Sequence, residues 1–146
     1  MTQQARDVDV LARTIWGEAR GEGRAGQIAV GWSIRNRVEM DLHSDGKPDW
    51  WGEGYDGVCR APWQFSCWNR KDPNSAYLRG DKVIQAAQLQ RCREVAMAVI
   101  AGSEPDPTGG ATHYYNPKAV SKTPAWAPVS TFTVKIGAHL FFKDVP

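Results

Sequence analysis

The 146-residue sequence has no long apolar run and no strong excess of either charge. Its longest apolar stretch, residues 95–101, is far shorter than the roughly 20 residues of a membrane-spanning helix, so we expect no stable membrane insertion. The net charge is only +2 and the basic residues form no stripe, so we expect no nucleic-acid partner. The first residues lack the apolar segment of a signal peptide, which predicts synthesis in the cytoplasm.

Motifs for metal, thiol and serine chemistry are also missing. The three cysteines and three histidines show no C-x-x-C or H-E-x-x-H spacing, and no G-x-S-x-G segment is present, so we expect no metal and no cofactor. Cys92 falls on the apolar face of a helical pattern and is interpreted as a core residue. Cys59 and Cys67 flank one loop and could form a disulfide outside a reducing compartment. A cysteine nucleophile with His113 as its base remains an alternative.

The chain is large enough for one domain, expected over residues 1–146, with a core that needs no disulfide or metal. Monomer is the default expectation. Seven tryptophans are an unusual number, and five of them lie between positions 32 and 68. Core filling alone does not account for so many indoles in a domain of this size.

Residues 16–23, W-G-E-A-R-G-E-G, follow an amphipathic helical pattern in which Asp7 is the expected N-cap. The apolar residues at helical spacing are Val8, Leu11, Ala12 and Ile15. Extending this register places Glu18 and Glu22 on the buried side. Desolvation there would raise the pKa of a carboxyl toward the range of a general acid, which makes Glu18 the candidate catalytic residue. The alternative is a plain helix end with solvated glutamates.

Two further helices are predicted, at residues 24–40 and 82–101, the second ending at Gly102. Arg37 lies near the end of the first, where a buried arginine could pair with a glutamate carboxylate. Between them, residues 41–80 show no periodicity, and a loop of this length with many aromatic residues indicates function. We expect some of its aromatics to stack on sugar rings and the others to anchor the loop; they are Trp50, Trp51, Tyr55, Trp63, Phe65 and Trp68.

The last third of the chain has the pattern of short strands. Residues 109–117 form an aromatic run bounded by turn residues, and residues 131–143 alternate and turn near Gly137, as in a hairpin. Pro124, Trp126 and Pro128 suggest an extended surface segment. Helices followed by short antiparallel strands predict an α+β domain.

Three motifs, in order, resemble the cell-wall hydrolase family of the spore cortex-lytic enzyme type. They are W-G-E-A-R-G-E-G with the following A-G-Q-I-A-V-G-W-S-I-R-N-R-V, then P-W-Q-F-S-C-W-N at residues 62–69, and A-T-H-Y-Y-N-P at residues 111–117. The second motif is similar to the Trp-rich form found in phage and Gram-negative members. The resemblance extends over nearly the entire chain.

The resemblance implies a lysozyme-like or lytic-transglycosylase-like helical body with a small antiparallel sheet. It implies that the partner is the glycan strand of peptidoglycan and that Glu18, the first glutamate of E-A-R-G-E, is catalytic. No export signal or separate wall-binding domain is visible, so we expect a phage-type endolysin that reaches the periplasm through a holin-made hole.

The expected reaction is cleavage between N-acetylmuramic acid and N-acetylglucosamine. A lytic transglycosylase needs one carboxylate and leaves 1,6-anhydromuramic ends, whereas a hydrolytic muramidase needs a second carboxylate, for which Glu22 is the candidate. We favour the first route, with Glu22 as a structural, pKa-tuning or substrate-binding residue. The other expected substrate-binding residues are Gln64, Phe65, Ser66, Tyr114, Tyr115 and Asn116. A tyrosine hydroxyl bonded to Glu18 would orient its carboxyl.

Two alternatives from other classes remain open. One is a non-catalytic glycan-binding module that uses the Trp-rich loop. The other is an amidase or peptidase that uses a metal or a thiol.

Overall fold

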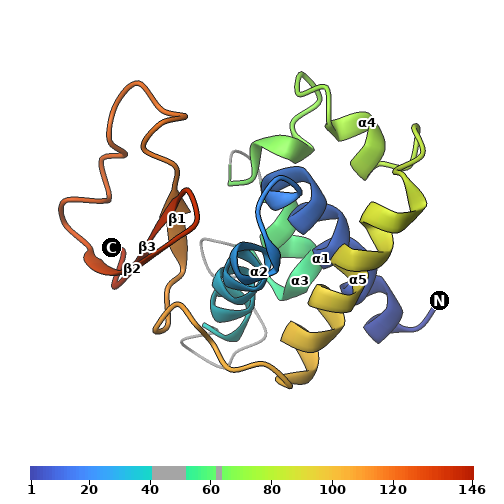
Figure 1. Ribbon diagram of the computed structural model, residues 1–146, viewed down its shortest axis with the longest axis horizontal. Helices are drawn as coiled ribbons and strands as arrows, with labels where there is room; N and C mark the ends of the chain where they lie inside the picture. Colours follow the sequence, from blue (N-terminus) through green and yellow to red (C-terminus); the bar gives the residue numbers. More distant parts are fainter. Residues whose placement is uncertain (41–51, 62–63) are drawn as a thin grey trace.

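The structure is a computed structural model that describes residues 1–40, 52–61 and 64–146. A helical body stands beside a small antiparallel sheet (Figure 1), which confirms the expected α+β class. The helices are α1 (Gln3–Ala19), α2 (Arg24–Glu39), α3 (Gly54–Arg60), the short 3₁₀ helix η1 (Ser66–Trp68), α4 (Ser75–Leu78) and α5 (Ala86–Ala101). The strands are β1 (His113–Tyr115), β2 (Thr131–Ile136) and β3 (His139–Lys143). No helix in the described ranges is long and apolar enough to cross a bilayer.

Helix α1 begins earlier than its sequence pattern predicts. The predicted N-cap Asp7 is wrong, because the Thr2 hydroxyl caps the helix by accepting a hydrogen bond from the Ala5 amide at 3.1 Å. The first turn is solvent-exposed, so apolar spacing carries no signal there. The predicted apolar face is confirmed, since Leu11, Ala12 and Ile15 are fully buried.

Helices α1, α2 and α5 pack closely around the core. Gly31 of α2 permits this approach, because a Cβ at that position would lie 3.0 Å from a methyl of Val99 and 3.4 Å from one of Ile15. The predicted face of α5 is also confirmed, and it consists of Cys92, Val95, Ala96 and Val99.

The ends of α5 show how one boundary was predictable and the other was not. Its C-terminus is capped by Gly102 at φ +71°, as predicted. Its start is at Ala86, not near residue 82. Ile84 is 3% exposed but lies in a non-helical segment, so its burial made the helical pattern look longer than the helix.

The prediction of irregular chain over residues 41–80 is wrong where α3, η1 and α4 form. These elements span seven, three and four residues, too short for an apolar period to be read. Three of the six aromatics considered for sugar stacking, Trp50, Trp51 and Trp63, lie outside the described residues.

Two aromatics of this segment anchor it to the helical body. Tyr55 and Trp68 pack against the core, and the indole N–H of Trp68 donates to the Thr14 hydroxyl at 2.9 Å. The expectation that part of this aromatic set is structural is therefore confirmed for both.

The sheet has the order β1-β3-β2, and both strand pairs are antiparallel. The predicted C-terminal hairpin is confirmed, and its turn contains Gly137 at φ +57°. The run at residues 109–117 contributes only the three residues of β1. Helix α2 contacts β1 and β2, and Figure 1 shows the sheet on the α2 side of the body. Strands β1 and β2 therefore pack on the helical body through α2, the helix that follows the end of α1.

Candidate active site

A pocket of about 590 Å³ lies between the helices and the sheet, and Glu18 is part of its wall. We call it the Glu18 pocket. It brings together every predicted site residue except Glu22, namely Glu18, Gln64, Phe65, Ser66, Tyr114, Tyr115 and Asn116. Trp126 and His139 also line it. Sequence reasoning had not assigned these two residues to the site. The position of Trp126 between two prolines was a signal that could have identified it. His139 offered no signal beyond its place in the predicted hairpin.

Glu18 is the only acidic residue among the described residues that line this pocket. Burial raises its pKa from 4.5 to about 7, because desolvation disfavours the charged carboxylate. The Asp72 carboxylate raises the pKa further, while the Cys67 thiol and the Arg37 guanidinium lower it. A carboxyl with a pKa near 7 can both donate and accept a proton near neutral pH.

The position of Glu18 depends on a close contact between α1 and η1. A Cβ at Gly17 would lie 2.6 Å from Cβ and 2.8 Å from Sγ of Cys67, so only glycine permits this approach without a shift. The contact brings the Cys67 thiol to 3.5 Å from Oε1 of Glu18, where it donates a weak hydrogen bond. Sequence reasoning considered Cys67 as a possible disulfide partner, nucleophile or metal ligand and missed this role.

Arg37 of α2 is buried and forms part of the pocket wall. Its Nε donates to the Thr112 carbonyl and its Nη1 donates to Oε1 of Gln64 at 3.0 Å. Burial lowers the pKa of Arg37 to about 10, so it stays charged near neutral pH. Its charge lowers the pKa of Glu18, and its hydrogen bond positions Gln64 at the pocket wall.

Tyr114 places a buried hydroxyl at the pocket. That oxygen has no hydrogen-bond partner within the described chain, so the expected bond between a tyrosine and the Glu18 carboxyl is not formed by Tyr114. Burial, together with the nearby Glu18, raises the pKa of Tyr114 well above 10, which keeps the phenol protonated. An unpartnered buried donor at a pocket wall is available to a ligand oxygen.

Part of the pocket wall is a cluster of aromatic rings. Trp126 meets Tyr115 edge-on at 6.0 Å between ring centroids, and Phe142 stacks on Tyr115 at 5.8 Å. The prediction of an extended surface segment around Trp126 is wrong, because the chain turns there and the Ala127 amide donates to the Pro124 carbonyl at 3.0 Å. The Trp126 indole packs on the sheet and lines the pocket.

The thiols do not suit nucleophilic chemistry. Cys59, Cys67 and Cys92 are free and buried, so the disulfide left open by the sequence is not formed in this structure. Burial raises the pKa of Cys59 to about 12 and that of Cys67 higher still, and a protonated thiol is a poor nucleophile. His113, the alternative base, is buried with its pKa lowered to about 3, chiefly by desolvation. The described residues contain no group of three side chains suited to hold a metal ion.

The placement of Glu22 on the same helical face as Glu18 is wrong. Helix α1 ends at Ala19, so Glu22 lies in the turn before α2, where a helical register no longer applies. Its Oε1 accepts a hydrogen bond from the Ala138 amide at 3.3 Å and lies 3.6 Å from Nδ1 of His139. Glu22 thus contacts the turn of the β2–β3 hairpin and does not line the Glu18 pocket.

Comparison with known proteins points to one family. The sequence matches the model of the cell wall hydrolase family over residues 21–142, a range that begins just after Glu18. It is 32% identical to a spore cortex-lytic enzyme of Halalkalibacterium halodurans and 30% identical to one of Oceanobacillus iheyensis, over 92% and 94% of this chain. The chain spans only 34% and 41% of the length of these two relatives.

The structural comparison covers the whole fold. The catalytic domain of the germination-specific lytic transglycosylase SleB from Bacillus anthracis matches with a TM-score of 0.67 and 28% identity. The match covers 98% of this chain and 97% of that domain. The SleB catalytic domain of Bacillus cereus matches with the same TM-score and identity, over 98% of this chain and 92% of that one. These matches confirm the expected lytic-transglycosylase-like body with a small sheet. The chain belongs to the cell wall hydrolase family.

Proposed function

We propose that this domain cleaves peptidoglycan glycan strands between N-acetylmuramic acid and N-acetylglucosamine, as a lytic transglycosylase with Glu18 as its acid and base. One observation carries the proposal: a buried glutamate with a pKa of about 7 is the only acidic residue among the described residues lining a 590 Å³ pocket. The similarity to a lytic transglycosylase catalytic domain over nearly its full length supports the same reaction class.

In the proposed mechanism, protonated Glu18 first donates its proton to the glycosidic oxygen, and the bond from C1 of muramic acid to that oxygen breaks. The resulting carboxylate then accepts the proton of the C6 hydroxyl of the same muramic acid. The C6 oxygen forms a bond to C1 and leaves a 1,6-anhydro end. Glu18 is protonated again at the end of the cycle, so one carboxylate is enough.

The pocket walls supply the contacts that a sugar needs. The lining includes Gln64, Phe65, Ser66, Tyr114, Tyr115 and Asn116. We assign the amides and hydroxyls to the sugar oxygens, and the faces of Tyr115 and Trp126 to stacking on a sugar ring. The Tyr114 hydroxyl is assigned to the substrate and not to the resting Glu18 carboxyl.

The hydrolytic alternative requires a second carboxylate near the sugar. Glu22 is held at the hairpin turn, whereas Asp72 is near enough to raise the pKa of Glu18. Asp72 lines an adjoining hollow that shares Ser66 with the Glu18 pocket. If this domain is a muramidase, Asp72 is therefore the carboxylate to test.

The deciding experiment is mass spectrometry of products released from purified peptidoglycan sacculi by the parent protein, Glu18→Gln and the control Glu94→Gln. Glu94 is exposed on α5, so its substitution should leave the reaction unchanged. We expect 1,6-anhydromuropeptides from the parent and the control, and none from Glu18→Gln.

Other outcomes have definite meanings. Reducing muramic ends would contradict the transglycosylase route and favour a muramidase. No released fragments from folded parent protein would contradict enzymatic action and favour the glycan-binding module. Release that stops with a chelator or a thiol-alkylating agent, with stem peptides as products, would favour the amidase or peptidase.

A phage-type endolysin is the biological setting that we propose for this activity. The support is the Trp-rich motif at residues 62–69, which resembles the form found in phage and Gram-negative members of the family. The test is expression in a Gram-negative host with and without a co-expressed holin. Lysis only with the holin is expected, and rapid lysis without it would contradict the proposed release. Light scattering during size-exclusion chromatography tests the expected monomer.

A further inference from the structure

Away from the Glu18 pocket, arginines surround a second hollow of about 610 Å³, which we call the arginine pocket. They come from α1, from α3 and from the chain around α4, and they are Arg6, Arg13, Arg60, Arg70 and Arg79. The arginine pocket shares no lining residue with the Glu18 pocket. Because like charges repel, such a cluster needs compensation from the protein or from a ligand.

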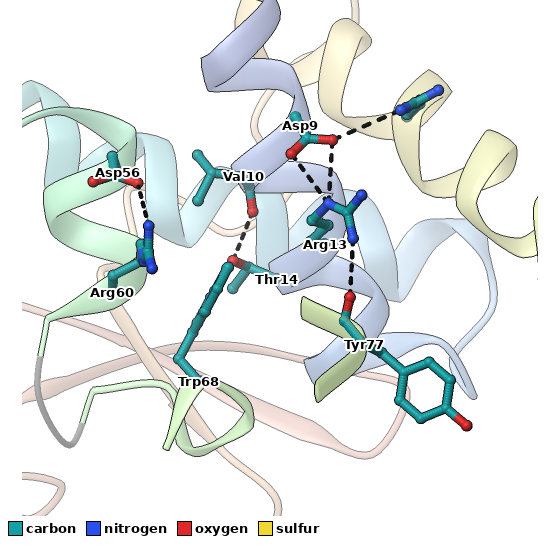
Figure 2. A network of polar contacts seen from close by, with 9 residues as sticks. Asp9, Val10, Arg13, Thr14, Asp56, Arg60, Trp68 and Tyr77 are labelled. Carbon is teal, nitrogen blue, oxygen red and sulfur yellow. Dashed lines mark hydrogen bonds and ion pairs between the residues drawn. The ribbon is translucent and has the colours of Figure 1, made fainter. Parts of the chain in front are cut away.

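Three aspartates in the lining supply part of this compensation, and Figure 2 shows two of the resulting pairs. The pairs are Asp9 with Arg13, Asp56 with Arg60 and Asp81 with Arg79, at 3.1, 3.5 and 3.1 Å. Five arginines against three aspartates give the lining side chains a charge of +2. Asp9 also lies 3.7 Å from Arg93 of α5, so its charge is shared between two arginines.

The ion pairs hold two guanidinium groups in fixed positions without using all their donors. The Arg13 side chain is only 21% exposed, and its Nη1 donates to the Tyr77 carbonyl at 2.9 Å (Figure 2). Arg79 is 28% exposed, and its Nη1 donates to the Ser75 hydroxyl at 2.7 Å. Within the described chain neither Nη2 has a hydrogen-bond partner. Arginines that are held in place with spare N–H groups suit a carboxylate or a phosphate.

The two remaining sources of positive charge are Arg6 and Arg70, which form no ion pair with any residue that the structure describes. The Trp68 indole adds an apolar wall, fixed through its hydrogen bond to Thr14 and covered by the Arg60 guanidinium at 4.8 Å (Figure 2). A cationic pocket with an aromatic wall fits an anion that also carries apolar groups better than it fits a small inorganic ion.

The arginine pocket lies within reach of the candidate catalytic residue. Arg13 precedes Glu18 by five positions on α1, roughly 7.5 Å along the helix axis and about 140° around it, so the two side chains leave different faces of the helix. A hollow lined by residues 69–73 connects the two pockets, since it shares Ser66 with the Glu18 pocket and Arg70 with the arginine pocket. A tetrapeptide, which spans at most roughly 13 Å, would run along this hollow from one pocket toward the other.

We propose that the arginine pocket binds the carboxylates of the stem peptide that peptidoglycan carries on muramic acid. This inference rests on the proposed function, which identifies the polymer as peptidoglycan. The positive charge and the volume of the arginine pocket, and its position beside the hollow next to the Glu18 pocket, indicate the stem peptide as the part that binds there. The glycan chain itself is largely uncharged, and the stem peptide ends in free carboxylates. The protein would therefore act faster on glycan strands that keep their peptides than on strands without them.

The test compares Arg6→Gln/Arg70→Gln with the control Arg24→Gln/Arg91→Gln. Both pairs remove two positive charges, and the control arginines line a different hollow beside α5. Calorimetry measures binding of a synthetic stem tetrapeptide, of its carboxyl-amidated form and of inorganic phosphate to each full-length chain. We expect Arg6→Gln/Arg70→Gln to weaken tetrapeptide binding about tenfold and the control to leave it unchanged. Amidation should weaken binding to the parent by a similar factor.

A second arm measures release from intact sacculi and from glycan strands stripped of peptides. We expect Arg6→Gln/Arg70→Gln to slow release from sacculi and to match the parent on stripped strands. No tetrapeptide binding by the parent would overturn the inference. So would equal weakening by both double variants, or phosphate binding as tight as tetrapeptide binding, which would indicate a general anion site. Tetrapeptide binding by a parent that releases no fragments would support this inference while contradicting the proposed function.

Discussion

Replacing Glu18 by glutamine should stabilise the protein at alkaline pH while it abolishes activity. In the folded protein the pKa of Glu18 is raised from 4.5 to about 7, chiefly by desolvation. Below pH 4.5 the carboxyl is neutral in both the folded and unfolded states, and burial has no electrostatic cost. As the pH rises from 4.5 through 7, the unfolded chain releases this proton first, so the free energy of unfolding falls with pH.

The size of this effect follows from the same shift. One pKa unit corresponds to about 1.4 kcal/mol, so a pKa of about 7 in place of 4.5 costs about 3 kcal/mol above pH 8. Glutamine cannot ionise, can accept the Cys67 hydrogen bond and has nearly the same volume. We therefore expect Glu18→Gln to be more stable than the parent by about 3 kcal/mol at pH 8.5, or roughly 10 °C in Tm, and equally stable at pH 4.

The assay is urea unfolding followed by tryptophan fluorescence between pH 4 and 8.5, on the parent, Glu18→Gln and Glu94→Gln. Exposed Glu94 accepts a hydrogen bond from Gln90, which glutamine can also accept, so this control should follow the parent. Equal pH dependence of the free energy of unfolding in the parent and Glu18→Gln would refute the reasoning, because it would mean that Glu18 is not desolvated.

Substitutions at three further positions test Glu18 and the contacts that support its pocket. Cys67→Ala removes the thiol that lowers the pKa of Glu18, so the alkaline limb of the pH–rate profile should move to higher pH. Cys67→Ser should move that limb less. A shift of the limb to lower pH would contradict this reasoning. Gly17→Ala improves helix propensity, but its new methyl group collides with Cys67. Urea unfolding should therefore show that the free energy of unfolding falls by about 1–3 kcal/mol. An increase in the free energy of unfolding would contradict the close packing of α1 on η1. Glu22→Gln keeps an acceptor for the Ala138 amide, so most muropeptide release should persist; a loss as complete as in Glu18→Gln would make Glu22 a catalytic carboxylate.

Apolar periodicity predicted the elements whose burial is continuous along one face. Ile15 of α1 and Val99 of α5 belong to such faces, and the helical spacing of their apolar neighbours predicted both helices. The alternation of apolar residues along the end of the chain predicted the final hairpin. The same signal misplaced boundaries where burial and helix do not coincide, as at exposed Thr2 and at buried but non-helical Ile84. Helix α3 gave too short a pattern to be read.

The candidate site shows the same division. The motifs identified Glu18, and the late Tyr-Tyr-Asn run supplied three more residues that the structure brings into one pocket. Contacts between distant segments have no local pattern, which is why the roles of Cys67 and His139 were missed. The assignment of Glu22 failed for a local reason, since Gly21 and Gly23 follow the end of α1 and the chain turns before Glu22 can continue the helical register.

Glu22 explains how the hairpin keeps its place against the helical body. Its carboxylate occupies space that a side chain at Gly26 or Gly137 would fill, since a Cβ at Gly26 would lie 2.9 Å from Cβ of Glu22, and one at Gly137 would collide with Oε2. The same carboxylate accepts the Ala138 hydrogen bond and faces His139, which lines the Glu18 pocket. Burial lowers the pKa of His139, so near neutral pH the link depends chiefly on the amide hydrogen bond. Glu22 thus holds the hairpin that carries His139 to the Glu18 pocket, whereas Glu18 is itself part of the pocket wall.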